Sequence, residues 1–220
     1  MTEPTDLTIC PAHKGFAWLE IETFGVAAHG SLPDEGVDAI VKMGRVLIEL
    51  DALDRSLRAN ASHPLLKSGS LHAALIEGGS GLSTYPERCL LQVERRTIPG
   101  ETNAVVLEQI ESITRKLAEA DPTFRAEVRL GLTREPYEVA LDQPIVQVIQ
   151  RQATAELGKT RAIEGGFGWM DSAILGAAGI PTVIFGPSGE GAHAAVEWVD
   201  LDDVEACRRI YAATAREFCG

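Results

Sequence analysis

The sequence predicts a mixed α/β fold in two parts, and three observations support this prediction. Three stretches before residue 131 alternate apolar and polar residues, as half-buried strands do, and the mostly apolar stretch 71–76 is expected to be a fourth strand. Two stretches between them have apolar residues at helical spacing. From residue 135 the pattern changes to helices around one continuous apolar run, 181–185, which is typical of a buried parallel strand.

The elements of the first part are expected in a fixed order. Strands are predicted at residues 17–21, 71–76, 88–93 and 124–130. Ser31-Leu32-Pro33-Asp34 is a helix-start signal, residues 54–70 are expected to be a loop, and Thr102 or Asn103 is expected to cap the second helix. The order βαββαβ is the ferredoxin-like arrangement, an antiparallel sheet with two helices on one face. Many functions use this fold, so the fold alone identifies none of them.

Composition excludes some classes of partner. The net charge of −12 argues against a nucleic-acid backbone, which requires clustered lysine and arginine. No apolar run is long enough to span a bilayer, and the first residues have no basic or apolar signal region, so a cytoplasmic protein without a membrane partner is expected. The four cysteines form no C-x-x-C pair and are expected to be free thiols.

Four groups of short motifs stand out, each of them weak alone. They are Glu3–Leu7 with 12–15; 25–33 around His29; Gly78-Gly79 with 85–86 and 94–101; and 170–172 with 179–181, 185–187 and 192–197. In this order and spacing they resemble the carboxyl-terminal part of the zinc-dependent acetylornithine deacetylase, succinyl-diaminopimelate desuccinylase, aminoacylase and glutamate carboxypeptidase family. The resemblance covers nearly the whole chain.

The resemblance implies an α/β chain in which a partial zinc-exopeptidase-type catalytic domain is interrupted by a ferredoxin-like βαββαβ lid. The lid would span residues 14–134, and the catalytic part would be residues 1–13 and 135–220. It further implies a homodimer formed through the lid. The expected activity is hydrolysis of an amide bond in a small N-acyl amino acid or peptide, with two zinc ions as cofactor. Cobalt or manganese are alternatives, because carboxylate and imidazole ligands bind several of these metals.

Two residues match metal ligands of the resembled family. Glu3 and His193 would each be an outer ligand of a different zinc, and carboxylate and imidazole suit that metal. Glu197 would orient His193 through the second ring nitrogen. The alternatives are a polar residue near a chain end for Glu3 and a surface loop residue for His193.

Other residues match the handling of substrate. His29 would reach into the partner's active site and stabilise the oxyanion, and its alternative is a local turn histidine. Arg96 would bind the substrate carboxylate, and its alternative is a solvated arginine paired with Glu94. Gly168 and Asp171 match a loop that contacts substrate, although Asp171 is equally suited to cap the helix that it opens.

The sequence departs from the family pattern in two ways. Ser83 stands where many relatives have a substrate-contacting asparagine. The family's His-x-Asp motif, bridging aspartate and paired glutamates have no counterpart, so the chain is expected to be a carboxyl-terminal fragment that is inactive alone. The alternatives are a non-enzymatic dimerisation or binding module built on the lid, and an enzyme completed by a separate polypeptide.

Overall fold

Residues Gly15–Glu135 form unit 2 of the computed structural model, which describes residues 1–220, and Met1–Lys14 with Pro136–Gly220 form unit 1. The chain therefore crosses between the units at Lys14–Gly15 and at Glu135–Pro136. The sequence placed these crossings at residues 14 and 134. Each unit has a hydrophobic core of its own.

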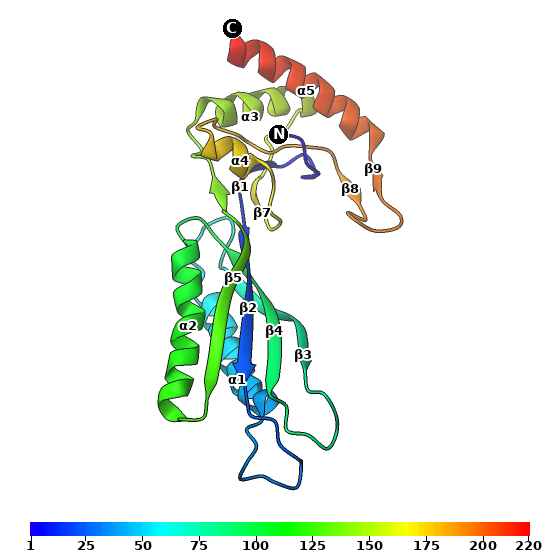
Figure 1. Cartoon of the computed structure of the whole chain (residues 1–220). Helices are drawn as coiled ribbons and strands as arrows, with labels where there is room; N and C mark the ends of the chain where they lie inside the picture. The colour runs from blue at the N-terminus through cyan, green and yellow to red at the C-terminus, as the bar shows by residue number, and fades with distance from the viewer. The chain divides into compact units, whose positions relative to one another are not determined.

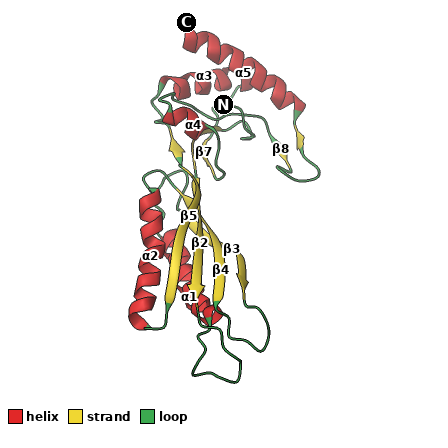
Figure 2. Cartoon of the chain, viewed as in Figure 1, coloured by secondary structure: helices red, strands yellow, loops and turns green.

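Unit 2 has the predicted βαββαβ order of elements (Figure 1). Its sheet has the strand order β3-β4-β2-β5, and every neighbouring pair is antiparallel (Figure 2). The elements are β2 (Gly15–Phe24), α1 (Ala39–Ala59), β3 (Ser70–Gly78), β4 (Arg88–Thr97), α2 (Asn103–Ala120) and β5 (Arg125–Arg134).

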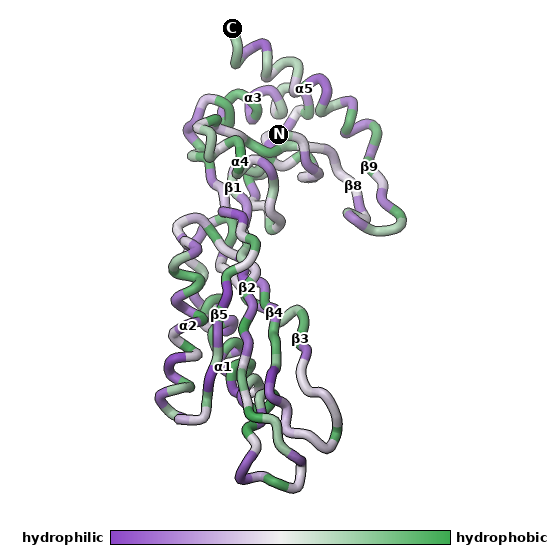
Figure 3. The backbone as a smooth tube through the Cα atoms, viewed as in Figure 1, coloured by the Kyte–Doolittle hydropathy of each residue, from purple (hydrophilic) through white to green (hydrophobic).

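Alternation along the central strands builds the core of unit 2. In β4 every second residue is buried, from Cys89 to Thr97. Figure 3 shows both apolar and polar residues along the strands of this sheet. The buried residues of β2 and β4 share one core with residues of α1 and α2, so both helices cover the same face of the sheet. Thr102, one of the two predicted caps, accepts a hydrogen bond from the amide of Val105 at the start of α2.

The predicted start of the first helix was wrong. α1 begins at Ala39, and the Asp38 side chain caps it by accepting from the amide of Val41 at 2.9 Å. Val26 and Val37 exchange two backbone hydrogen bonds that close the preceding residues into a loop. The helix also continues to Ala59, through residues 54–59 that were expected to be a loop, because its last turns pack leucines onto the core.

Unit 1 contains a three-stranded sheet in the order β6-β1-β7. β1 (Ile9–His13) pairs parallel with β7 (Ile163–Gly166) and antiparallel with β6 (Tyr137–Glu138). The other elements are α3 (Pro144–Leu157), α4 (Ser172–Ala177), the hairpin of β8 (Gly189–Glu190) and β9 (Trp198–Val199), and α5 (Leu201–Cys219). α3 and α5 pack together over this core (Figure 1).

The apolar run at residues 181–185 is buried from Thr182 onward but is not the predicted parallel strand. Ile184 makes only an isolated antiparallel bridge, with Cys10. The next backbone amides bond elsewhere: Phe185 donates to the carbonyl of Met1, and Gly186 donates to the Thr5 hydroxyl. The run is therefore held by the first residues of the chain instead of by a strand ladder.

Two further expectations concern cysteines and membranes. All four cysteines are free thiols; Cys10, Cys89 and Cys207 are buried, and Cys219 is exposed. None of the helices combines the length and the apolar character that a membrane crossing requires.

Candidate functional site

Two of the predicted site residues of unit 2 lie side by side. His29 forms an isolated antiparallel bridge with Thr84, the amide of Gly30 donates to the carbonyl of Ser83 at 2.8 Å, and that of Tyr85 donates to Ala28 at 2.9 Å. These bonds join the loop after β2 to the loop after β3. The structure thus brings His29 and Ser83 together, although 53 residues lie between them in the sequence.

The environment of His29 defines which ring nitrogen is available. Its Nδ1 accepts from the backbone amide of Ser31 at 3.2 Å and lies 2.8 Å from the Ser31 hydroxyl. Because Nδ1 accepts a proton donor, the ring proton of the neutral form belongs on Nε2. The exposed ring therefore presents an N–H group to a ligand. In this geometry His29 makes the local turn contact through Nδ1 and can still donate a hydrogen bond through Nε2.

Arg96 has the partner that its alternative interpretation named. The guanidinium forms an ion pair with Glu94 on the same strand and lies over the ring of Phe16, 5.5 Å from its centroid. The side chain remains one-third exposed. To bind a substrate carboxylate, Arg96 would have to exchange or share the carboxylate of Glu94.

Glu3 belongs to a segment that is fastened to the residues after the 181–185 run. The amide of Leu7 donates to the carbonyl of Gly186 at 2.9 Å, and that of Gly186 donates to the Thr5 hydroxyl at 2.9 Å. A Cβ atom on Gly186 would lie 1.9 Å from the Glu3 carbonyl oxygen, so only glycine permits this approach. The structure thus places Glu3 next to the segment that leads to His193.

His193 lies in the turn of the β8–β9 hairpin, where its φ of +64° is in the left-handed region that costs a residue with a Cβ some strain. Asp203 fixes the base of the hairpin by accepting from the amide and the hydroxyl of Ser188. His193 and Glu197 are both exposed, and no hydrogen bond or ion pair joins them. The proposed orienting contact from Glu197 is therefore not made in this conformation.

Gly168 and Asp171 lie in the segment between β7 and α4. Asp171 occupies the N-cap position of α4, but its side chain makes no capping hydrogen bond, so its carboxylate is free for another partner. Gly168 has open space around its Cα, and both residues are exposed. The segment is an accessible surface loop anchored to β7.

His13 was not among the predicted site residues, yet it contacts this segment. It is fully buried, and its ring lies edge-on to that of Trp169 with 6.5 Å between centroids. Burial lowers the pKa of His13, while the carbonyls of Lys14 and Met170 act in the opposite direction. The available signal in the sequence was a histidine at the end of the short apolar strand Ile9–His13.

The side chains of residues 1–220 do not by themselves fit a zinc centre. No group of three histidine, cysteine, aspartate or glutamate side chains comes close enough to hold a metal ion. Protein zinc sites use three or four such ligands. Glu3 and His193 are two donors, so further ligands would be needed to complete a site around either of them.

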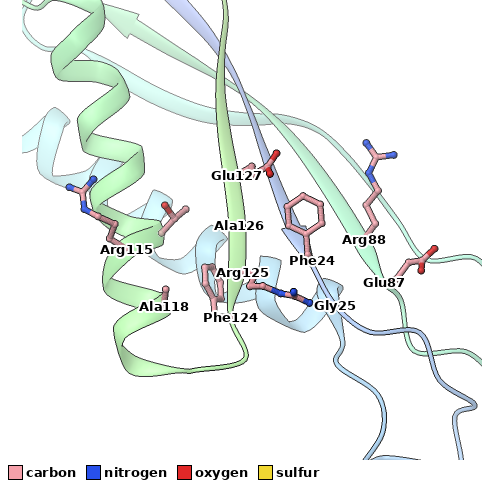
Figure 4. A pocket seen from close by; sticks show the side chains of 11 residues that line it. Phe24, Gly25, Glu87, Arg88, Arg115, Ala118, Phe124, Arg125, Ala126 and Glu127 are labelled. Atoms are coloured by element: carbon pink, nitrogen blue, oxygen red, sulfur yellow. The ribbon is translucent and has the colours of Figure 1, made fainter.

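A groove of about 810 Å³ in unit 2 is separate from all these residues (Figure 4). Phe24 and Phe124 line it together with Arg88, Arg115 and Arg125. Arg88 is paired with Glu22 and Arg115 with Glu108, so two of the three cations are already neutralised. None of the predicted site residues lines this groove.

Comparison with known proteins decides the family. Residues 11–122 match the M20 family model described as "Peptidase dimerisation domain". The chain belongs to the M20 peptidase family. Among M20 relatives, it is 29% identical over 224 residues to the acetylornithine deacetylase of Myxococcus xanthus, covering 99% of this chain and 57% of that protein. It is 31% identical over 231 residues to the uncharacterized protein YgeY of Escherichia coli, covering 96% of this chain and 55% of YgeY.

Solved structures agree on the fold. The chain resembles the aminopeptidase PepT of Bacillus cereus with a TM-score of 0.81 at 17% identity, over 99% of this chain and 56% of that one. It resembles the dipeptidase Dug1p of Saccharomyces cerevisiae with a TM-score of 0.71 at 11% identity, over 98% and 56%. The chain thus spans little more than half the length of the M20 proteins that it matches.

Proposed function

We propose that this chain functions within a metal-dependent hydrolase that cleaves amide bonds in small N-acyl amino acids or short peptides. The supporting observation is that similarity to acetylornithine deacetylase extends over 99% of the chain, and so includes both unit 1 and unit 2. In this proposal, unit 2 is the lid domain. Residues of unit 1 would belong to a zinc-exopeptidase-type catalytic domain, with Glu3 and His193 as two of its metal donors.

The residues of the chain have separate parts in this proposal. The Nε2–H of His29 would donate to the oxyanion that forms on the attacked carbonyl, in the active site of the partner subunit. Arg96 would bind the substrate carboxylate in place of Glu94. Ser83, beside His29, and Gly168 with Asp171 would contact the rest of the substrate. Two zinc ions, or cobalt or manganese, would supply the Lewis acid when bound.

The test compares two proteins with a panel of N-acetyl amino acids and dipeptides, with and without added zinc. The protein made from the complete reading frame that contains this chain is expected to hydrolyse at least one of them. The 220-residue chain alone is expected to show no zinc-dependent turnover, because its own donors do not form a metal site. A zinc-loaded complete protein that hydrolyses none of the panel would contradict the proposal.

Two variants separate chemistry from metal binding. His29→Ala is expected to lower kcat by about 10²–10³, the range for loss of one oxyanion donor, with the zinc content unchanged. His193→Ala is expected to lower the zinc content itself. Glu119→Gln, at an exposed residue of α2, serves as the control and is expected to change neither.

We also propose that unit 2 joins two copies of the chain into a homodimer. Besides the match to a dimerisation domain, β3 is an edge strand whose backbone is unpaired on one side, and residues 72–78 are all exposed. Beside it, α1 exposes Ile40, Val41 and Ile48. A Cβ on Gly78 would lie 3.1 Å from Ile40, so strand and helix form one continuous apolar surface.

The opposite edge of the sheet is less suited to self-pairing. β5 carries Arg125, Glu127, Arg129 and Arg134, and charged edge strands resist pairing with another sheet. Glu77 is the only aspartate, glutamate, lysine or arginine in β3. Light scattering on the purified chain is expected to give the mass of a dimer, and a monomer at all concentrations would count against this proposal.

A further inference from the structure

His13 is the buried titratable residue that the proposed chemistry does not use. It lies at the end of β1 with its side chain fully shielded from solvent. Nδ1 is 2.9 Å from the carbonyl oxygen of Lys14, which can only accept, so Nδ1 carries the proton of the neutral ring. In the neutral ring Nε2 then carries the lone pair, and no donor bonds to it. A buried polar atom without a partner requires an explanation.

The surroundings of the ring come from two other parts of unit 1. Tyr137 of β6 lies 5.9 Å from it and Trp169 lies 6.5 Å from it, both measured between ring centroids. Burial lowers the pKa of His13 and the carbonyls of Lys14 and Met170 only partly oppose this, so the ring is neutral at neutral pH. Cys10 approaches the same place as an uncharged thiol, because burial raises its pKa.

The end of β1 holds the start of the 165–171 segment by several contacts. His13 pairs with Gly166 in the parallel ladder, and the amide of Lys14 donates to the Gly166 carbonyl at 3.1 Å. The Lys14 ammonium lies 5.5 Å from the centroid of the Phe167 ring. A Cβ on Gly166 would lie 2.8 Å from Met170 and 3.3 Å from both Cys10 and His13, so the segment folds tightly onto β1.

We propose that His13 is a positioning residue, whose neutral imidazole holds residues 165–171, and with them Gly168 and Asp171, against β1. The consequence for substrate rests on the proposed function, which assigns substrate contacts to Gly168 and Asp171. Placing a second proton on Nε2 creates a charge in a site closed to water, and the carbonyls of Lys14 and Met170 offset this cost of desolvation only in part. The segment therefore loosens when His13 is protonated.

Fluorescence of Trp169 reports directly on the protonation of His13 and the loosening of residues 165–171. Trp18 and Trp198 are about half exposed, so Trp18→Phe and Trp198→Phe leave Trp169 as the sole indole of a folded chain. Between about pH 8 and pH 5 we expect a sigmoidal loss of Trp169 emission, because an imidazolium beside an indole quenches it. Its midpoint is expected below about 6.5, the value of an unperturbed histidine.

Two substitutions provide the comparison. His13→Asn keeps a side-chain N–H for the Lys14 carbonyl but has no titrating ring, and it is expected to abolish the transition. His72→Asn removes an exposed histidine of unit 2 and is expected to leave it unchanged. A flat profile in the parent, or the same transition in His13→Asn, would overturn the proposal.

Hydrogen exchange tests the positioning without any substitution. In the parent chain, peptides covering 163–175 are expected to exchange faster at about pH 5.5 than at about pH 7.5, after correction for intrinsic rates, while peptides of α2 are not. Equal protection of 163–175 at both values would also overturn the proposal. Neither measurement uses turnover, so a failed hydrolase assay leaves this inference standing and a failed titration leaves the hydrolase proposal standing.

Discussion

Arg95 of β4 is a charged side chain that has no exposed surface. Its guanidinium pairs with the partly exposed carboxylate of Glu101 and donates to the Arg96 carbonyl, but Nε has no partner. Gly69 makes room for it, since a Cβ there would lie 2.1 Å from the guanidinium. The neighbouring Arg96 points to the other face of β4, so two consecutive arginines have different tasks.

Removing the charge of Glu101 should expose the dependence of the fold on this pair. Glu101→Gln leaves a buried cation without a counter-ion and is expected to lower the free energy of unfolding by about 3 kcal/mol. Glu108→Gln breaks the solvent-exposed pair with Arg115 and is expected to cost less than about 1 kcal/mol. Urea unfolding followed by circular dichroism compares the two variants. Equal midpoints would show that the buried pair contributes no more to stability than the exposed pair.

At the scale of elements, α1 and β3 share an apolar surface that the chain leaves uncovered. Ile40, Gly44 and Ile48 lie four residues apart and so share one face of α1. Ile48 is 68% exposed, and Ile76 of β3 is 55% exposed. Burying these side chains against a second copy would remove apolar surface from water, which favours association.

A lysine on this surface should therefore weaken the dimer. Ile48→Lys brings like charges together in a two-fold interface and is expected to raise the dissociation constant at least about tenfold, or about 1.4 kcal/mol. Val105→Lys, on the exposed side of α2, is the matched control and should leave association unchanged. Sedimentation equilibrium gives both constants; a loss of association in Val105→Lys alone would place the interface on α2 instead.

At the scale of the whole molecule, the chain forms two units, of which only one is continuous in sequence. Unit 2 is one uninterrupted stretch, whereas unit 1 is assembled from both ends of the sequence. The core of unit 2 draws on its own strands and helices alone. Folding of unit 2 should therefore not require unit 1.

A fragment of residues 15–135 is expected to fold and to unfold in one cooperative urea transition. A fragment of residues 25–135 lacks β2, which pairs with both β4 and β5 in the centre of the sheet, and is expected to remain unfolded. Far-ultraviolet circular dichroism distinguishes these states. If 15–135 were unfolded too, the core of unit 2 would depend on unit 1.

The sequence alone determined the order of elements in unit 2 and the family, because alternation and helical spacing report burial and because short motifs keep their order. It misplaced the start of α1 because Ser31 and Pro33 imitate a helix start, while the bonds between Val26 and Val37 are made only in the folded loop. It mistook residues 181–185 for a ladder strand because burial leaves the same apolar run whatever the backbone bonds to.

Only the tertiary structure decided how the candidate residues are held. Sequence distance hides the adjacency of His29 to Ser83 and of Glu3 to Gly186, since backbone bonds between distant loops create both. It also hides the burial of His13, because a histidine at a strand end has the same letter whether water reaches its ring or an indole covers it. Secondary structure depends mainly on the pattern of neighbouring residues. Shielding from water and the choice of hydrogen-bond partners depend instead on the packing of the whole unit.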